Sequence, residues 1–167
     1  MNSVKISVVI GTYNQKDKLR RVLDSFFNQT MPAPEYEIIV IDSGSTDGTK
    51  ELMDSYSPDC GYKPIVQRNE GKSGARNRGV TESNGKYIII TDADMIADKE
   101  FVKTHYDAHL ETKGTVCFEG VTYNMTDYHW PPDPKKIFPY ITGNYPNKKR
   151  LGWYYFLTGN ISFPKEL

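Results

Sequence analysis

The sequence predicts an α/β fold in which helices cover a mostly parallel central sheet. Up to Asp94, short runs of β-branched residues alternate with helical stretches, and this alternation is typical of β-α-β units. The chain has 167 residues, of which 38% are hydrophobic and 25% are charged. It is long enough to bury one core and too short for two full-sized domains, so we expect a single globular domain.

The first two predicted elements are a strand over Ile6–Ile10, ended by Gly11, and a helix over Lys16–Asn28. The strand is predicted because its residues are almost all β-branched. The helix is predicted because its apolar residues are spaced by three and four positions and so share one face. These residues are Leu19, Val22, Leu23, Phe26 and Phe27.

A second strand is predicted over Glu37–Asp42, followed by a polar turn over residues 43–48 and a helix over Thr49–Tyr56. We expect Ser45 or Thr46 to cap this helix, because a hydroxyl oxygen just before a helix accepts a hydrogen bond from a free N–H group of its first turn.

The third unit is a weaker strand over Pro64–Gln67 with a helix over Ser73–Ser83, and Tyr87–Thr91 is predicted as a fourth strand. After it we expect a helix over Lys99–Leu110 and a strand over Thr115–Tyr123. The order β-α-β-α-β-α-β up to residue 91 predicts a parallel sheet with helices on its faces.

Aromatic residues and prolines are dense from His129 to Leu167, and Trp153–Phe156 are four aromatic residues in a row. We therefore divide the domain into a core over residues 1–128 and an aromatic, proline-rich part over residues 129–167. This part either faces a substrate or packs on another surface. Its exposed apolar groups predict association into a homo-oligomer, or disorder of part of residues 129–150.

Composition excludes several classes of function. Lys plus Arg and Asp plus Glu number 21 each, so the net charge is zero and nothing indicates binding to nucleic acid. A bilayer span needs about 20 apolar residues, and neither such a run nor a secretion signal is seen. We expect a cytoplasmic protein. Cys60 and Cys117 stand far apart without a CxxC pair, which indicates neither a disulfide framework nor a zinc site.

The residues directly after each predicted strand are unusually polar, and ligands of open parallel sheets bind beyond the carboxyl ends of the strands. Any one aspartate there would be interpreted as a turn former or helix cap, but their coincidence at one sheet edge favours a binding site. The candidates are Thr12, Tyr13 and Asn14 after the first strand, Asp42 at the end of the second, Gly71 and Arg76 after the third, and Asp92, Ala93 and Asp94 after the fourth.

Asp92 and Asp94 are two positions apart at the exit of a buried strand. Carboxylate oxygens suit Mg²⁺ or Mn²⁺, which keep several waters and complete their shell with phosphate oxygens of a substrate. The spacing therefore predicts that Asp92 and Asp94 hold one of these ions.

Two other motifs do not qualify as sites. Gly71-Lys72-Ser73 resembles the end of a P-loop, but that motif needs glycine where this chain has Val66. His105 and His109 are four positions apart on a predicted helix but lack the glutamate of HExxH. We interpret them as solvated helix residues rather than metal ligands.

Several of these segments, in this order and spacing, resemble glycosyltransferase family 2. They are Ser7–Asn14, Gln29-Thr30, Glu37–Thr49, Asn69–Gly71, Ala75–Gly79, Asp92–Asp94 and Thr158–Ser162. The resemblance implies a GT-A type, Rossmann-like three-layer α/β/α fold. It also implies an inverting enzyme that takes a sugar from a nucleoside-diphosphate donor, such as a UDP-sugar, with the help of Mn²⁺ or Mg²⁺.

The resemblance also implies roles for the candidate residues. Thr12, Tyr13 and Asn14 would line the nucleotide pocket together with Gly71 and Ala93, and Asp42 would accept a hydrogen bond from the base. Arg76 would lie beside the base or diphosphate, Asp92 would approach the ribose, and Asp94 would bind the metal. The acceptor would be a saccharide or a lipid-linked hydroxyl, reached at the cytoplasmic face of a membrane.

The family usually continues into an acidic motif that supplies the general base for the acceptor hydroxyl. No residue of this chain matches that motif, so we expect the catalytic base beyond Leu167 and interpret the chain as a truncated, donor-binding half of an enzyme. Two alternatives stay open: a non-catalytic nucleotide-sugar binding or partner-docking module, and a nucleotidyltransferase. The latter needs a glycine-rich basic loop after the first strand, which Thr12–Gln15 is not.

Overall fold

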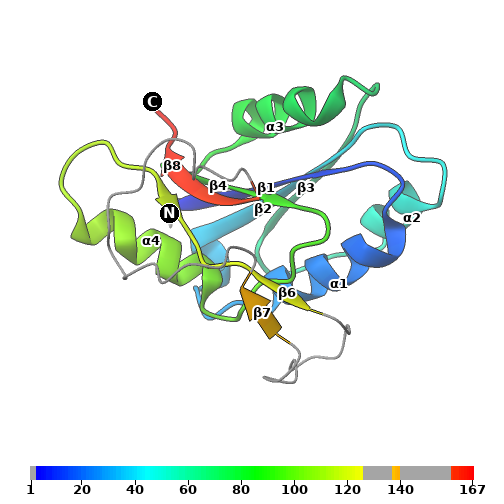
Figure 1. Ribbon diagram of the computed structural model, residues 1–167. Coiled ribbons are helices and arrows are strands. Elements are labelled where there is room, and N and C mark those ends of the chain that lie inside the picture. The colour runs from blue at the N-terminus through cyan, green and yellow to red at the C-terminus, as the bar shows by residue number, and fades with distance from the viewer. Residues whose placement is uncertain (1–2, 126–136, 140–158) are drawn as a thin grey trace.

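The computed structural model describes residues 3–125, 137–139 and 159–167. A six-stranded sheet forms the middle of three layers, with α3 on one face and α1, α2 and α4 on the other (Figure 1). The expected α/β fold with a mostly parallel sheet is therefore confirmed.

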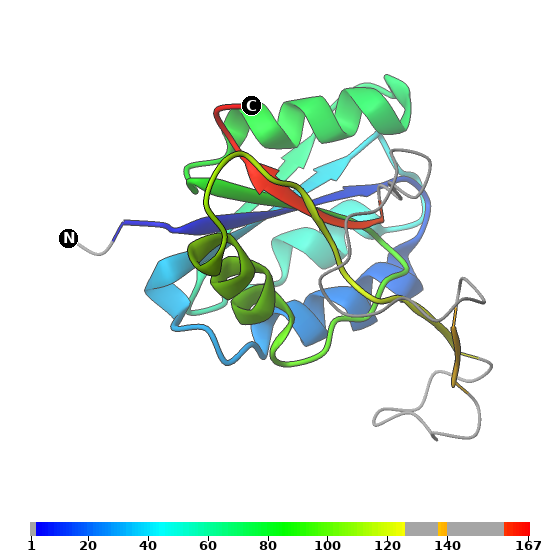
Figure 2. The same cartoon turned by 60° about the vertical axis from the view of Figure 1, so that its left-hand side comes forward.

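The strands of the sheet lie in the order β3-β2-β1-β4-β8-β5. The first four are parallel, and β8 runs antiparallel to both of its neighbours. Their bounds are β1 Ile6–Thr12, β2 Tyr36–Asp42, β3 Gly61–Val66, β4 Tyr87–Asp92, β5 Phe118–Glu119 and β8 Asn160–Pro164. A separate pair, β6 (Tyr123–Met125) and β7 (Ile137–Pro139), projects away from this sheet (Figure 2).

Four α-helices and one short 3₁₀-helix are seen in the described residues. Their bounds are α1 Lys16–Phe27, a 3₁₀-helix over Ala33–Glu35, α2 Thr49–Asp54, α3 Gly71–Glu82 and α4 Phe101–Glu111. Each predicted helix is present, with ends that differ by a few residues from the expected ones. None of the helices in the described ranges has the length and apolar character needed to cross a bilayer.

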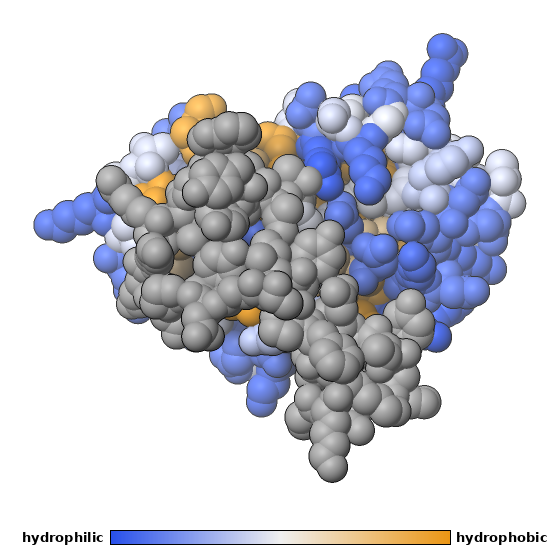
Figure 3. Space-filling model, viewed as in Figure 1, coloured by the Kyte–Doolittle hydropathy of each residue, from blue (hydrophilic) through white to orange (hydrophobic). Residues whose placement is uncertain are grey.

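Both faces of the central strands are buried, which explains why these strands are nearly continuous apolar runs. Alternate residues of β1 point to opposite faces, so Val8 and Ile10 pack with α1 while Val9 packs on the side of α3. The solvent-facing surface over α1 and α2 is largely hydrophilic (Figure 3). The helix α1 thus has the one-sided apolar character that its spacing predicted.

Predictions about β5, β8 and the cap of α2 were wrong. The strand expected over Thr115–Tyr123 is two short strands, β5 and β6, which residues 120–122 separate. The strand β8, which was not predicted, lies inside the segment predicted as irregular or surface-packing. Neither Ser45 nor Thr46 caps α2, because Asp47 Oδ1 accepts the hydrogen bond from the Thr49 N–H.

The expectations for Trp153–Phe156, for association through that segment and for residues 129–150 concern parts of the chain that lie almost wholly outside the described residues. The division into residues 1–128 and 129–167 stays a prediction for the same reason.

The buried carboxylate of Glu37 lies at the end of the sheet where β1 and β2 begin. Glu37 is 2% exposed, and its Oε1 accepts hydrogen bonds from Ser7 Oγ at 2.6 Å and from the Asn84 N–H. Lys63 Nζ lies 3.4 Å from its Oε2. Burial would raise the pKa of Glu37, but these hydrogen bonds and the Lys63 charge hold it below its ordinary value.

We expect Glu37→Gln to lower the free energy of unfolding by about 1 to 3 kcal/mol at pH 7, because the amide turns an N–H group toward donors. A carboxylate whose pKa is lowered by folding stabilises the folded state above its ordinary value of 4.5 and loses that contribution as the pH falls. Urea unfolding at pH 7 and pH 3 should therefore show the gap between wild type and variant narrowing in acid. A gap of the same size at both pH values would contradict this account.

Candidate functional site

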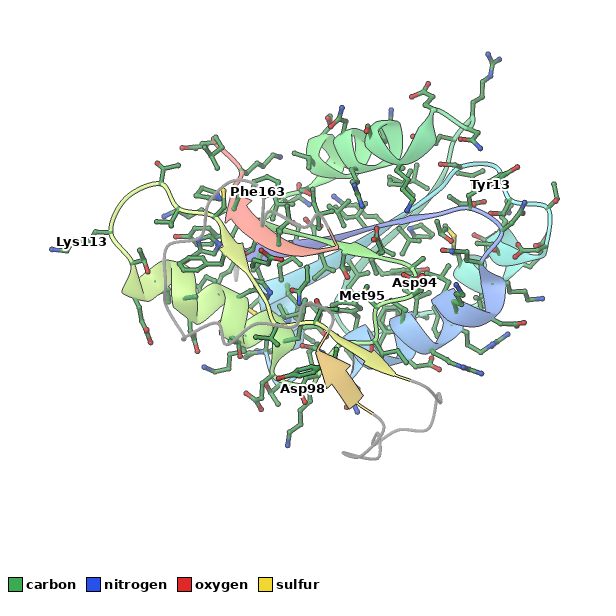
Figure 4. All side chains as sticks on the ribbon, in the orientation of Figure 1. Tyr13, Asp94, Met95, Asp98, Lys113 and Phe163 are labelled. Atoms are coloured by element: carbon green, nitrogen blue, oxygen red, sulfur yellow. The ribbon has the colours of Figure 1, made fainter. Side chains whose placement is uncertain are left out.

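A cleft of about 270 Å³ lies at the carboxyl ends of β1 and β4, with α3 along one side. Figure 4 shows Tyr13 after β1 and Asp94 after β4 at this edge of the sheet. The residues that line the cleft are Gly11, Thr12, Tyr13, Gln15, Ser43, Asn69, Gly71, Lys72, Ala75, Arg76, Asp92, Ala93 and Asp94. The edge that the sequence singled out therefore forms one concave surface.

Most of the candidate residues lie in this cleft, and two do not. Thr12, Tyr13, Gly71, Arg76, Asp92, Ala93 and Asp94 line it, whereas Asn14 and Asp42 are absent from its lining. Four further residues, Gln15, Ser43, Asn69 and Lys72, line the cleft and were not predicted as site residues. They belong to the same loops, so the position of these loops after the strands could have found them. Ser43 and Asn69 also lie within the family-like segments Glu37–Thr49 and Asn69–Gly71.

Asn14 joins the two loops that border the cleft, and Asp42 fixes the second of these loops. Asp42 is fully buried, and both of its oxygens accept hydrogen bonds from the Ser45 N–H at 3.2 Å, while Ser45 Oγ donates to Oδ1. Asn14 has a positive φ of 51°. Its Oδ1 accepts from the Thr46 N–H and its own N–H donates to Ser45 Oγ, both at 2.8 Å. Both side chains thereby fix the shape of the cleft from behind.

Thr12 brings an unpaired hydroxyl to the cleft. The residue is 4% exposed, and its Oγ1 is buried without a hydrogen-bond partner among the described residues. A buried hydroxyl without a partner costs free energy. This group is therefore suited to meet a polar atom of a ligand.

Arg76 on α3 forms an ion pair with Asp92 at the end of β4. The distance from Arg76 Nη2 to Asp92 Oδ1 is 2.8 Å, and the two side chains are 18% and 34% exposed. The pair fixes the orientation of the carboxylate, so that only Oδ2 is left without this contact. A side chain on Gly159 would place its Cβ 3.2 Å from that Oδ2, which makes Gly159 the backbone wall next to it.

Asp94 is the more open of the two cleft carboxylates. Lys18 Nζ on α1 lies 3.5 Å from Asp94 Oδ2, and both side chains are about half exposed. Such an exposed pair contributes little to stability. The Asp94 carboxylate is therefore free to exchange this contact for another cation.

The two carboxylates fit a divalent cation that takes part of its shell from a substrate. The described residues include no group of three His, Cys, Asp or Glu side chains that would enclose a metal ion. Mg²⁺ and Mn²⁺ need no such cage, because one or two carboxylates together with phosphate oxygens and water suffice. Asp92 and Asp94 supply hard oxygen ligands of this kind.

The interpretation of His105 and His109 as solvated residues was wrong. Both are 6% exposed and lie between α4 and β8. Burial lowers the pKa of both rings, and that of His109 falls to about 4. Both imidazoles are therefore neutral at pH 7.

A second hollow, of about 410 Å³, lies beside Phe27, Tyr36 and Cys60. Among the described residues, one carboxylate, Asp59, borders it, and no Lys or Arg does. It lacks the paired charges of the first cleft, so the first cleft is the candidate site.

A family model described as Glycosyl transferase family 2 matches residues 7–164. The poly(ribitol-phosphate) beta-glucosyltransferase of Bacillus spizizenii is 34% identical over 116 residues, which are 68% of this chain and 18% of that protein. The chain spans less than half the length of the curated relatives it matches.

Two solved structures are also similar. TarS 1–349 of S. aureus in complex with UDP-GlcNAc has a TM-score of 0.60 and 27% identity, over 68% of this chain and 33% of that one. The mannosyltransferase PcManGT of Pyrobaculum calidifontis, in complex with GDP-Man and Mn²⁺, has a TM-score of 0.56 and 28% identity, over 59% of this chain and 30% of that one.

Proposed function

Because the chain belongs to glycosyl transferase family 2, we propose that it forms the donor-binding part of an enzyme that transfers a sugar from a nucleoside diphosphate to a hydroxyl acceptor. Its fold is that of the GT-A glycosyltransferases. The observation that carries the proposal is the pair Asp92 and Asp94, which faces one cleft with Arg76 and Lys72.

The arrangement suits the departure of a nucleoside diphosphate. Negative charge grows on the phosphate oxygens as the bond to the sugar breaks, and groups that stabilise this charge more in the transition state than in the ground state accelerate the reaction. A divalent ion held by Asp92 and Asp94 would supply this stabilisation as a Lewis acid. Lys72 and Arg76 add fixed positive charge on the side of α3.

Other residues of the cleft would orient the carboxylates and bind the nucleotide. Arg76 orients Asp92 through their ion pair, and the Thr12 hydroxyl would bind a polar atom of the nucleotide. Asp42 lies behind the cleft, where its bonds to Ser45 would hold the loop that carries Ser43 into the cleft. The contact between Asp42 and the base that its family position implies stays a prediction. The acceptor, a saccharide or lipid-linked hydroxyl, and the cytoplasmic location stay predictions.

UDP is the proposed nucleotide. The similar structures were solved with UDP-GlcNAc and with GDP-Man and Mn²⁺, so both bases deserve a test. A thermal-shift titration with UDP, GDP, CDP and ADP, each with and without Mn²⁺, separates them. We expect Mn²⁺-dependent stabilisation that is largest with UDP, and the absence of a shift with every nucleotide would contradict the proposal.

We expect Tyr13→Ala to weaken UDP binding about tenfold, whereas Tyr13→Phe keeps the affinity of wild type. Tyr13 lines the cleft with half of its surface exposed, and stacking of a base on an aromatic ring contributes about 1 to 3 kcal/mol. Calorimetric titration with UDP measures the effect. Equal affinity in the alanine variant would remove Tyr13 from the nucleotide pocket.

A further inference from the structure

A row of buried polar side chains joins α4 to β8. His105 and His109 are one turn apart on the helix, and Asn160 and Ser162 are two apart on the strand, so each pair presents one face to the other. All four residues are at most 6% exposed. Ser162 Oγ lies 2.8 Å from His105 Nδ1 and 2.9 Å from His109 Nε2, and His105 Nε2 lies 3.0 Å from Asn160 Oδ1.

The chemistry of these groups allows one arrangement of protons. The Asn160 amide nitrogen faces the Val121 carbonyl, which accepts only, so its oxygen faces His105. His105 Nε2 must therefore carry the proton, and the neutral ring leaves Nδ1 as an acceptor for the Ser162 hydroxyl. Ser162 Oγ in turn accepts from His109 Nε2–H. The hydrogen bonds then run in one direction from His109 through Ser162 and His105 to Asn160.

Aromatic packing holds both rings in place. His109 stacks on Tyr87 with a centroid distance of 4.3 Å and meets the edge of Phe118 at 4.7 Å. His105 packs against Phe101 at 4.8 Å. The two imidazoles thus have fixed planes as well as fixed protons.

Asn160, the end of this row, lies next to the candidate site. Its backbone pairs with Thr91, the residue before Asp92, and Gly159 before it lies against Asp92 Oδ2. Asn160 also holds the turn between β5 and β6, because its carbonyl accepts from the Gly120 N–H and its amide donates to Val121. A side chain on Gly120 would collide with this amide at 2.4 Å.

We propose that His105 is a positioning residue of the donor site, which holds Asn160 in place and thereby sets Gly159 against the carboxylate of Asp92. The inference rests on the proposed function, because Asp92 matters here as one of the two proposed metal ligands. Arg76 fixes one oxygen of Asp92 from α3, and the row from α4 fixes the backbone beside the other.

The test compares UDP affinity with and without Mn²⁺ in two variants of His105. Phenylalanine keeps a ring of similar size and removes both nitrogens, whereas glutamine keeps one donor and one acceptor. Groups that orient metal ligands typically change metal affinity by about 10-fold or more. We expect His105→Phe to weaken Mn²⁺-dependent UDP binding about tenfold, with little change in the UDP affinity measured without metal. The His105→Gln variant should keep most of the Mn²⁺-dependent affinity of wild type.

Ser162→Ala and Ser7→Ala form a matched pair in case His105→Phe does not fold. Each removes a buried hydroxyl from the sheet, but Ser7 bonds Glu37 and Gly85 at the opposite end. We expect both to lower the melting temperature and only Ser162→Ala to weaken Mn²⁺-dependent UDP binding. Equal binding in both variants would assign the row a structural role alone.

Nitrogen-15 NMR of the imidazole rings gives a readout that needs no ligand. We expect both His105 and His109 as neutral Nε2–H tautomers, and an Nδ1–H form of His105 would overturn the row as described. A wild-type chain that does not bind UDP with Mn²⁺ would refute the proposed function and this inference with it. Wild-type binding that His105→Phe leaves unchanged would refute the inference alone.

Discussion

In the Asp94→Ala variant, we expect the Mn²⁺-dependent stabilisation by UDP to disappear. A ligand at 100 times its dissociation constant adds about 2.7 kcal/mol to the free energy of unfolding, which raises the melting temperature of a domain of this size by roughly 5 to 11 °C. Asp94 is the more exposed cleft carboxylate, and its contact with Lys18 is long and solvated. Removal of the Asp94 carboxylate should therefore remove a metal ligand while leaving the melting temperature of the free protein nearly unchanged.

Asp98→Ala is the matched control for that variant. Asp98 lies in the same loop between β4 and α4 but does not line the cleft (Figure 4), and its Oδ1 accepts from the Glu100 N–H before α4. We expect the Asp98→Ala variant to lose some stability and to show the full rise in melting temperature with UDP and Mn²⁺. An undiminished shift in Asp94→Ala would exclude Asp94 as a metal ligand.

Gly79→Ala should lower the free energy of unfolding by about 1 to 3 kcal/mol and weaken UDP binding at the same time. A Cβ at this position would lie 2.2 Å from Val9 Cγ1 on β1, and forcing an extra methyl group into a packed core costs energy of that order. The helix must move away from the sheet to make room. Since α3 carries Lys72 and Arg76, the cleft changes shape with it.

A double-mutant cycle with Val9→Ala tests this explanation, because that change removes the methyl groups in conflict. Urea unfolding should show that the double variant loses less stability than the sum of the two single variants, by about 1 kcal/mol or more. Strict additivity would mean that the two residues do not collide. A Gly79→Ala variant as stable as wild type would show that α3 accommodates the methyl group freely.

The first four strands and helices such as α1 could be predicted from sequence because their apolar patterns are local, whereas α3 has little apolar periodicity. The start of β3 was placed three residues too late, since Gly61, Tyr62 and Lys63 carry little strand signal at the half-exposed edge of the sheet. The strand β8 was missed because its Asn160 and Ser162 are polar on one face. That face is buried only because the two histidines of α4 meet it, and their partners lie more than fifty residues away in the chain.

The location of the cleft at one edge of the sheet could be predicted from sequence, but the contacts of its individual side chains could not. The rule that ligands bind beyond the strand ends identified Asp92 and Asp94 together with Thr12 and Arg76. It gave no means of telling a residue that faces the cleft from one that supports it. The contacts of Asn14 depend on Ser45 and Thr46 of a second loop, and those of Asp42 on Ser45 three residues later, and such loop geometry carries no periodicity.

The place of β8 in the sheet has a consequence for folding during synthesis. This strand pairs with β4 although some seventy residues separate them, so the ribosome releases β1 to β4 with their helices well before β8. Until then, the backbone edge of Ile88–Ile90 is unpaired, and an apolar edge of this kind promotes aggregation. Long-range pairing of this type also slows folding. The nascent chain therefore passes through a stage in which one edge of the half-built sheet is open to association with other chains.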